Sequence, residues 1–377
     1  MPVEAYLDNS ATTPICKKAR DRMVASIENI WGNPSSLHEK GIEADMLLRQ
    51  SRKKLCELLS CNEKEIVFTS GGTEGNNLAV FGAAYQNRRK GNRVITSAVE
   101  HPSVQKAFDR LGEEGFEVIR IPTDSKGLIN LTELENAVNE KTILVSIMAV
   151  NNEVGTIEPI EEIAKIVRRK SSPALVHVDA VQAFGKLPLS PKKLGIDLMT
   201  VSSHKIHGPK GVGALFIKEG TKLHSVAVGG GQERDIRPGT EPMPAIAGFF
   251  GAMEELKIKE SLSRLSDLRD YLVTELKKRD FVTINSPENA LPYIVNLSLK
   301  GLRSETVLNF LSDMEIYVSS GSACSKGHKS PVLTAMGLEN DIIDSSLRVS
   351  MSRFTTKEQL DRFLEGIDTA VKVIRKK

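Results

Sequence analysis

The chain has 377 residues, of which 40% are hydrophobic and 26% are charged, a composition typical of globular rather than disordered proteins. At roughly 150 residues per domain, this length predicts two to three domains. Lysines and arginines number 51 against 48 aspartates and glutamates, and the resulting net charge of +3 gives no support to direct binding of nucleic acid.

The four cysteines, Cys16, Cys56, Cys61 and Cys324, match neither a zinc-binding spacing nor a disulfide framework, so no metal site is predicted. The first residues lack the basic start and apolar stretch of a signal peptide. The longest apolar run, at 143–150, falls far short of the roughly 20 residues that a membrane span needs. We therefore expect a cytoplasmic protein without a membrane partner.

Short apolar runs alternate with amphipathic stretches over the first two-thirds of the chain. The apolar runs predict strands at 65–70, 93–97, 117–122, 143–150, 175–179, 198–202 and 212–218. The amphipathic stretches predict helices at 74–89, 103–111, 131–138 and 160–169. This alternation is typical of an α/β fold with a mainly parallel sheet that is covered on both faces.

A second pattern follows a loop rich in glycine and proline at 229–242, which is expected to lack regular structure and to be functional. One long helix is predicted at 245–280. Beyond it, the sequence predicts strands near 293–299, 315–319 and 347–351 and helices at 304–313 and 357–377. We predict a large domain over residues 15–260 and a smaller α+β domain made of residues 1–14 and 261–377.

Five of the predicted strands run directly into clusters of polar residues. The clusters are Ser70-Gly-Gly-Thr-Glu-Gly-Asn-Asn77, Glu100-His-Pro-Ser103, Asn151-Asn-Glu153, Asp179-Ala-Val-Gln182 and Ser202-Ser-His-Lys205. Because ligands of open α/β sheets bind beyond the carboxyl ends of the strands, all five clusters can surround one ligand. The sequence therefore predicts a binding site at this edge of the sheet.

Three of these clusters suggest chemistry that suits pyridoxal phosphate (PLP). Gly72 and Thr73 open a helix after a strand, where free N–H groups suit a phosphate, although a plain helix cap is the alternative. Asp179 is a strand-end carboxylate that needs a partner, either a protonated pyridine nitrogen or an internal salt bridge. Lys205 is crowded by donors that would lower its pKa and favour Schiff-base formation, although most lysines are solvated surface groups.

Other residues add candidates with simpler alternatives. His101 can stack on an aromatic ring and carry protons, or it is an ordinary strand-end histidine. Asn151 and Gln182 are uncharged donors for a phenolate oxygen or a carboxylate. Cys324 lies in a small, polar, glycine-rich segment whose lysines and histidine favour the thiolate, which is the nucleophilic form. Arg348 can bind a carboxylate through its planar fork, or it forms an ion pair within the smaller domain.

Taken together, these segments resemble the cysteine desulfurases, class V aminotransferase relatives in the PLP fold type I superfamily. The matching motifs are Tyr6-Leu-Asp-Asn-Ser-Ala-Thr-Thr-Pro14, Gly32-Asn-Pro-Ser-Ser36, Thr69-Ser-Gly-Gly-Thr-Glu74, Glu100-His-Pro102, Asn152-Glu-Val-Gly155, His177-Val-Asp-Ala180, Ser203-His-Lys205, Arg237-Pro-Gly-Thr240 and Ser320-Gly-Ser-Ala-Cys324. The resemblance covers essentially the whole chain, and it implies the PLP-dependent transferase fold of type I.

The resemblance also implies a role for each candidate residue. Lys205 would hold the aldehyde of PLP, His101 would stack on its ring, and Cys324 would accept sulfur. Arg348 would bind the substrate carboxylate. The remaining contacts would be Asp179 on the ring nitrogen, Gln182 and Asn151 on the ring hydroxyl or the substrate, Gly72, Thr73, Ser202 and His204 on the phosphate, and Thr240 from the other subunit of a homodimer.

The function that this resemblance predicts is a PLP-dependent sulfurtransferase, a cysteine desulfurase. It would convert L-cysteine to L-alanine and keep the sulfur on Cys324 as a persulfide. The persulfide would pass to an acceptor protein, either an iron–sulfur scaffold or a tRNA-thiolation enzyme. A selenocysteine lyase or another PLP enzyme of the class V family is the alternative, and a non-catalytic scaffold of the same fold is a second one.

Overall fold

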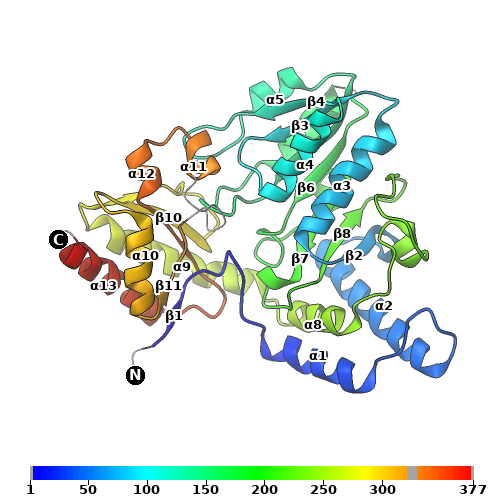
Figure 1. The fold of residues 1–377 in the computed structure, drawn as a ribbon, viewed down its shortest axis with the longest axis horizontal. Helices are drawn as coiled ribbons and strands as arrows, with labels where there is room; N and C mark the ends of the chain where they lie inside the picture. Colours follow the sequence, from blue (N-terminus) through cyan, green and yellow to red (C-terminus); the bar gives the residue numbers. More distant parts are fainter. Residues whose placement is uncertain (1–2, 171, 321–328, 375–377) are drawn as a thin grey trace.

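The computed structural model describes residues 3–170, 172–320 and 329–374. A larger α/β unit occupies the right of Figure 1, and a smaller unit at the left contains both described ends of the chain. The first strand, β1 (Ala5–Tyr6), pairs in parallel with β11 (Ile316–Tyr317), so the start of the chain joins the C-terminal unit. In the described ranges, no helix combines the length and the apolar character that crossing a bilayer requires.

The larger unit is built on a seven-stranded sheet with the order β2-β8-β7-β6-β5-β3-β4. Its strands are β2 (Ile66–Thr69), β3 (Arg93–Ser97), β4 (Glu117–Ile121), β5 (Thr142–Met148), β6 (Leu175–Asp179), β7 (Leu198–Ser202) and β8 (Gly213–Ile217). Only β8 runs antiparallel to its neighbours, so the other six strands are parallel to one another. The predicted mainly parallel sheet is confirmed, and the carboxyl ends of β2, β3, β5, β6 and β7 share one edge.

Both faces of this sheet are buried. Successive side chains of a strand point to opposite sides, and each side packs into a core of its own. Val67 and Leu215 belong to a core with residues of helices α3 (Gly72–Asn87) and α4 (Pro102–Glu113). Their neighbours Phe68 and Phe216 belong to a second core on the other side. Helices that contribute to this second core are α1 (Lys17–Asn29), α2 (Glu39–Leu59), α6 (Ile160–Arg169) and α8 (Met243–Glu254).

The prediction of one helix over 245–280 is wrong, because α8 ends at Glu254 and α9 (Ile258–Lys277) begins four residues later. No glycine or proline marks this break. The Glu255 carboxylate accepts a hydrogen bond from the Lys18 backbone N–H at 3.1 Å and forms an ion pair with Arg353 at 3.1 Å. These contacts with distant segments hold the turn between the two helices, so local sequence does not reveal it.

The loop at 229–242 is not wholly irregular either. It contains a short 3₁₀ turn, Gln232–Asp235. Glu233 of this turn is buried and forms an ion pair with Arg52 of α2 at 2.7 Å. The loop is therefore held against the body of the larger unit by a contact that lies 181 residues away in sequence.

The smaller unit contains an antiparallel sheet with the order β12-β10-β9. Its elements are β9 (Val282–Ile284), β10 (Ile294–Leu299), α10 (Ser304–Asp313), α11 (Pro331–Ala335), α12 (Asn340–Asp344), β12 (Ser346–Ser350) and α13 (Lys357–Ile374). One hydrophobic core continues from this unit into the larger one. The division into domains at residues 14/15 and 260/261 therefore stays a prediction.

Candidate active site

Asp179 lies at the carboxyl end of β6, near the middle of the sheet edge. Its side chain is buried; one carboxylate oxygen accepts a hydrogen bond from the Val181 backbone N–H at 2.9 Å and the other from the Asn76 amide at 2.7 Å. No lysine or arginine nitrogen of the described residues lies within 4.0 Å of this carboxylate. Burying a carboxylate without a cationic partner costs free energy, so the site favours a ligand that carries positive charge.

His101 is joined to Asp179 through two polar side chains. Asn76 also donates to the Ser103 hydroxyl at 2.9 Å, and this hydroxyl lies 2.8 Å from Nδ1 of His101. The Ser103 backbone N–H donates to the same ring nitrogen at 3.2 Å. Nδ1 is therefore an acceptor, which leaves the proton of a neutral ring on Nε2. Desolvation lowers the pKa of His101, nearby Lys205 lowers it further, and Asp179 opposes both effects, so the ring is neutral at pH 7.

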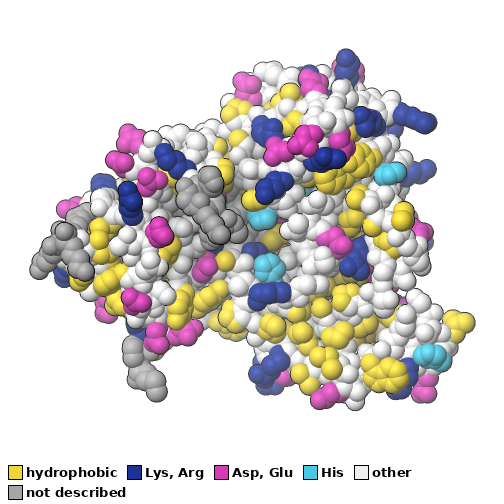
Figure 2. All heavy atoms as spheres, in the orientation of Figure 1, with side chains coloured by type: hydrophobic (Ala, Val, Ile, Leu, Met, Phe, Trp, Pro, Cys, Tyr) yellow, Lys and Arg dark blue, Asp and Glu magenta, His cyan; other side chains and the backbone are white. Residues whose placement is uncertain are grey.

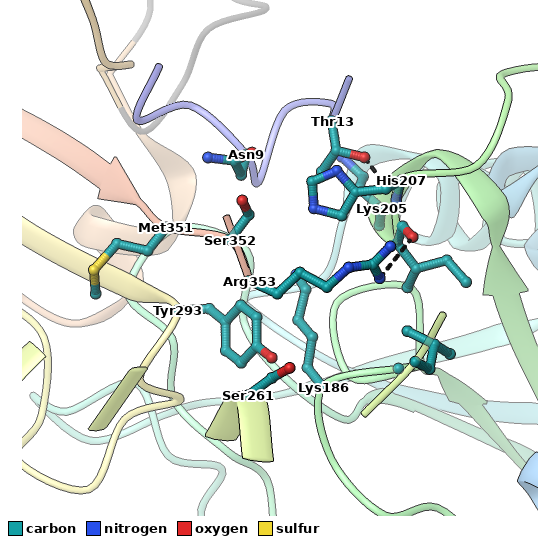
Figure 3. A pocket seen from close by; sticks show the side chains of 13 residues that line it. Asn9, Thr13, Lys186, Lys205, His207, Ser261, Tyr293, Met351, Ser352 and Arg353 are labelled. Atoms are coloured by element: carbon teal, nitrogen blue, oxygen red, sulfur yellow. Dashed lines mark hydrogen bonds between the residues drawn. The ribbon is translucent and has the colours of Figure 1, made fainter. Parts of the chain in front are cut away.

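Lys205 closes the short 3₁₀ turn Ser203–Lys205 that follows β7. Its ammonium group donates to the backbone carbonyls of Ser10 and Ala11, the latter at 2.7 Å. Thr13 is tied to the same turn, because its backbone N–H donates to the His204 carbonyl at 3.1 Å. The N-terminal segment therefore lies directly against the candidate lysine (Figure 3).

An anion site is formed where α3 begins. A Cβ atom added to Gly72 would lie only 2.7 Å from the Val181 side chain and 3.9 Å from the Cβ of Ser202, so glycine is needed there and Ser202 lies beside it. The Ser202 hydroxyl is buried and has no hydrogen-bond partner among the described residues. Thr73, the next residue of the helix, is exposed. Backbone N–H groups at a helix N-terminus together with a free hydroxyl suit a phosphate.

Of the two other residues expected at the phosphate, His204 contacts the N-terminal segment, whereas Thr240 is exposed. The Nδ1 atom of His204 is 3.2 Å from the Thr12 hydroxyl, and burial together with nearby lysines lowers its pKa to about 4. His204 would therefore act as a neutral donor. Thr240 is exposed, and no hydrogen bond joins it to the rest of the site within the described part of the chain.

The two candidate amides, Gln182 and Asn151, are both buried but differently engaged. Gln182 donates to the Ser10 carbonyl at 3.0 Å and accepts from Lys186 at 2.8 Å. Asn151 donates to the Val99 carbonyl at 3.1 Å and accepts from two backbone N–H groups, at 2.9 and 3.0 Å. Asn151 therefore holds the loop after β5, and any contact with a ligand would be an additional role.

Arg348, in β12 of the smaller unit, faces the larger unit. Its side chain is 4% exposed, and its guanidinium forms an ion pair with Asp8 at 2.8 Å and donates to the Asn152 carbonyl at 3.0 Å. Its Nε has no hydrogen-bond partner among the described residues. The internal ion pair that the sequence left open is therefore present, with the Asp8 carboxylate as the partner.

Cys324 lies outside the described residues, but both flanks of its segment are anchored at this site. Ser319 exchanges two backbone hydrogen bonds with Arg348, at 2.6 and 3.2 Å. Ser330 donates to the buried carboxylate of Glu153, two residues after Asn151. The described residues on either side of this segment therefore contact Arg348 and Glu153 at the candidate site.

The structure adds residues that the sequence reasoning did not assign: Asp8, Ser10, Asn76, Ser103 and Lys186. Asn76 and Ser103 stand inside polar clusters that the sequence had already marked, so their presence could have been expected. Asp8 and Ser10 stand inside the motif at 6–14, but no role was expected for them, because their contacts join segments that are distant in sequence. Lys186 lies four residues after Gln182, outside the marked cluster.

Comparisons with known proteins agree with this arrangement. The model of the aminotransferase class V family matches residues 5–363. The cysteine desulfurase IscS of Methanosarcina thermophila is 43% identical over 375 residues, which cover 98% of this chain and 92% of the relative. The solved structure of a NifS-like protein superposes with a TM-score of 0.93 at 38% identity, covering 98% of this chain and 100% of that protein.

A structure described as SspA in complex with cysteine has a TM-score of 0.83 at 32% identity and covers 94% of this chain and 100% of that one. The predicted fold is thereby confirmed as that of the PLP-dependent transferases of type I. The chain belongs to the aminotransferase class V family and, within it, to the cysteine desulfurases.

Proposed function

We propose that this enzyme converts L-cysteine to L-alanine and retains the sulfur on Cys324 as a persulfide. The observation that carries the proposal is the buried Asp179 carboxylate, which has no cationic partner among the described residues and lies on the same sheet edge as Lys205 and the candidate anion site at Gly72. A pyridine nitrogen, an aldehyde and a phosphate are the three groups that this edge suits. Full-length similarity to cysteine desulfurases supports the same chemistry.

The residues present fit PLP on two independent observations. Asp179 lacks a cation and Ser202 lacks a hydrogen-bond partner, both among described residues. PLP supplies an aldehyde that captures an amino group and a ring that stabilises negative charge on the adjacent carbon. Asp179 would hold the proton on the ring nitrogen, and His101 would cover one face of the ring with a neutral imidazole.

The phosphate contacts would come from Gly72, Thr73, Ser202 and His204 of one subunit and Thr240 of the other. The free Ser202 hydroxyl and the N-terminal N–H groups of α3 support the first part. Gln182 and Asn151 would donate to the ring hydroxyl or to the substrate. Gln182 already directs its amide N–H toward the Ser10 carbonyl that Lys205 contacts.

Lys205 would hold the cofactor and then move the proton of the substrate α-carbon through its Nζ atom. Arg348 would bind the substrate carboxylate in place of Asp8. The Cys324 thiolate would attack the substrate sulfur, so that an S–S bond forms as the C–S bond breaks and the electron pair of that bond stays with the carbon skeleton. L-Cysteine and a thiol thus yield L-alanine and a persulfide, with atoms and electrons balanced.

The second subunit is supported by exposed apolar side chains. They lie on α1, α2 and the connection between these helices: Val24, Ile27, Trp31, Leu37, Ile42 and Met46. Figure 2 shows apolar side chains gathered on the lower part of the larger unit, where α1 and α2 lie in Figure 1. A contiguous apolar surface is typical of an interface, so we propose a homodimer. Trp31→Glu should convert it to monomers in sedimentation experiments.

The acceptor of the persulfide sulfur is proposed to be a protein, either an iron–sulfur scaffold or a tRNA-thiolation enzyme. Capture of the persulfide acceptor by mixed-disulfide trapping would identify it. The expected cytoplasmic location stays a prediction.

Replacement of Cys324 tests the persulfide step. Cys324→Ala, supplied with L-cysteine and a reductant, should lose sulfide and alanine release by about 10²-fold or more, because no nucleophile is left for the substrate sulfur. The visible absorbance of the bound cofactor should persist. Cys61→Ala, which removes a partly exposed thiol outside the site, is the matched control.

Undiminished sulfide release by Cys324→Ala would refute the persulfide step and favour a lyase that releases sulfur or selenium directly. Cofactor absorbance without any turnover of cysteine in the unmodified enzyme would favour another class V reaction.

A further inference from the structure

Lys186 is a buried lysine that the proposed chemistry does not use. Its residue is only 5% exposed, and it lies in a hollow beside Lys205 that Tyr293 and Ser261 also line (Figure 3). No carboxylate lies within 4.0 Å of its amino group among the described residues. Burial of a cation without an anion is costly, so a lysine is not what packing alone would favour here.

The polar contact of Lys186 is with Gln182, four residues earlier in the chain, in the turns that follow β6. Its Nζ donates to Oε1 of Gln182 at 2.8 Å, and Nε2 of Gln182 donates to the Ser10 carbonyl at 3.0 Å. The Ser10 carbonyl also accepts from the Lys205 ammonium. Three side chains and one backbone carbonyl thus form a continuous chain of hydrogen bonds from Lys186 to Lys205.

This chain leaves the Gln182 amide only one favourable orientation. An amino group donates and the Ser10 carbonyl accepts, so a flipped amide would place two donors opposite each other on one side and two acceptors opposite each other on the other. Each mismatch would leave a buried polar group unsatisfied. Lys186 and the Ser10 carbonyl together therefore decide that the N–H side of Gln182, not its carbonyl side, faces the carbonyl that Lys205 also contacts.

We propose that Lys186 is a positioning residue: it fixes the Gln182 amide so that one N–H donates to the Ser10 carbonyl and the second N–H is available to the cofactor's ring hydroxyl. This inference rests on the proposed cofactor role of Gln182 and extends it to a residue that does not itself touch the ligand.

The charge on Lys186 is secondary to its hydrogen bond. Burial, together with the cationic Lys205 and Arg348, lowers the pKa of Lys186 to about 7. The other ionisable groups around the hollow are His207, Tyr293 and Arg353, and the Lys186 amino group lies 5.4 Å from the centre of the Tyr293 ring. Both the amine and the ammonium carry N–H donors, so the orientation of Gln182 is maintained on either side of pH 7.

The test uses the full-length enzyme loaded with PLP and follows its visible absorbance as a function of pH. A donor on the ring hydroxyl oxygen withdraws charge from it and weakens its hold on the shared proton of the lysine–cofactor linkage. Loss of that donor should therefore raise the pH midpoint of the absorbance change. Lys186→Met and Gln182→Ala should each raise the midpoint by about half to one pH unit, the range that one hydrogen bond accounts for.

The double variant separates the proposed route from a direct effect of charge. If Lys186 acts through Gln182, adding Lys186→Met to Gln182→Ala should leave the midpoint of Gln182→Ala unchanged. A further rise in the double variant would show that Lys186 acts by its own charge and would overturn the proposal. So would an unchanged midpoint in Lys186→Met alone, whatever happens to its thermal stability.

The role of Gln182 is tested separately by the same data. An unshifted midpoint in Gln182→Ala would remove the cofactor contact and the inference with it, whereas a shift in Gln182→Ala without one in Lys186→Met would overturn the inference alone. Lys186→Leu replaces Lys186→Met if the methionine variant does not fold.

Discussion

Asp179 and Arg348 are both buried charged residues of the candidate site, and their surroundings differ. Asp179, in the larger unit, is held by an amide and a backbone N–H and has no cation beside it among the described residues. Arg348, in the smaller unit, is paired with Asp8 at 2.8 Å. Among the described residues, one charge therefore lacks a counter-ion and the other already has one.

The difference indicates how each half of the site would bind its ligand. A resident group that stays bound can neutralise Asp179 permanently, so the fold leaves this charge unpaired. A substrate comes and goes, and a buried arginine without a carboxylate would cost several kcal/mol each time the site emptied. In the proposed function, Asp8 would stabilise Arg348 between turnovers, so that the larger unit would suit a cofactor and the smaller one a substrate.

The largest loss of activity is expected at Lys205, the residue of the larger unit that would hold the cofactor. Lys205→Ala should abolish the visible absorbance of the bound cofactor and reduce turnover by about 10³-fold or more, because both the attachment point and the proton carrier are lost. Absorbance spectroscopy and alanine release measure the two effects. A persistent band in the variant would mean that another lysine holds the aldehyde.

Asp179→Asn should reduce turnover by about 10²-fold, because a neutral amide cannot stabilise a positive charge on the ring nitrogen. The kcat for alanine formation measures it. Asp197→Asn is the control, since Asp197 is as deeply buried but is paired with Arg168 and Lys218. That variant should lose stability and keep the kcat of the folded fraction. Equal losses of kcat in both variants would contradict a special role for Asp179.

Arg348→Lys should raise the KM for L-cysteine by about 10-fold with kcat within about threefold, because lysine keeps the charge but loses the two-pronged contact with a carboxylate. Steady-state kinetics separate the two constants. Arg279→Lys, which alters an arginine paired with Asp368 elsewhere in the smaller unit, should leave KM unchanged. A fall in kcat alone for Arg348→Lys would argue against binding of the substrate carboxylate.

The smallest effect is expected at Glu158, a buried carboxyl outside the site. Burial raises its pKa to about 8 from a usual 4.5, so the folded protein keeps a proton that the unfolded chain releases. Stability should therefore fall as pH rises from about 4.5 to 8. Glu158→Gln cannot titrate and should reduce this fall by at least about 1 kcal/mol in urea unfolding at pH 5 and 8.5, since each unit of pKa shift corresponds to about 1.4 kcal/mol.

Glu161→Gln, three residues later in the first turn of α6 and exposed, should leave the pH dependence of stability as it is. An identical fall with pH in Glu158→Gln would show that burial of this carboxyl does not govern the trend. Together the two variants show whether burial of a carboxyl governs the pH dependence of stability at a residue, Glu158, for which no ligand contact is proposed. Asp179, by contrast, is proposed to contact the cofactor.

Strand positions were predictable because each strand is a short apolar run that is buried on both faces. Strands β3, β6 and β7 begin and end at the predicted residues. The break between α8 and α9 was not predictable, because the contacts of Glu255 with Lys18 and Arg353 hold it. The sequence pattern over 245–280 reflects a local preference for helix, and the contacts of Glu255 with distant segments override that preference.

In the candidate site, residues at strand ends could be found from the sequence, whereas those that hold them in place could not. Asp179, Lys205 and His101 follow apolar runs and carry chemistry that stands out. Ser10 contributes only a backbone carbonyl, and Lys186 is important for the amide that it orients. Neither kind of role leaves a mark in a local pattern.

The sequence alone therefore determined the kind of fold and the edge of the sheet where the chemistry is predicted, because hydrophobic periodicity and strand-end polarity are local properties. Only the tertiary structure decided which charges are paired. Asp8 meets Arg348 across 340 residues, and Asp179 is left without a cation among the described residues. Pairing depends on how segments far apart in the chain come together during folding, and composition and spacing do not encode that proximity.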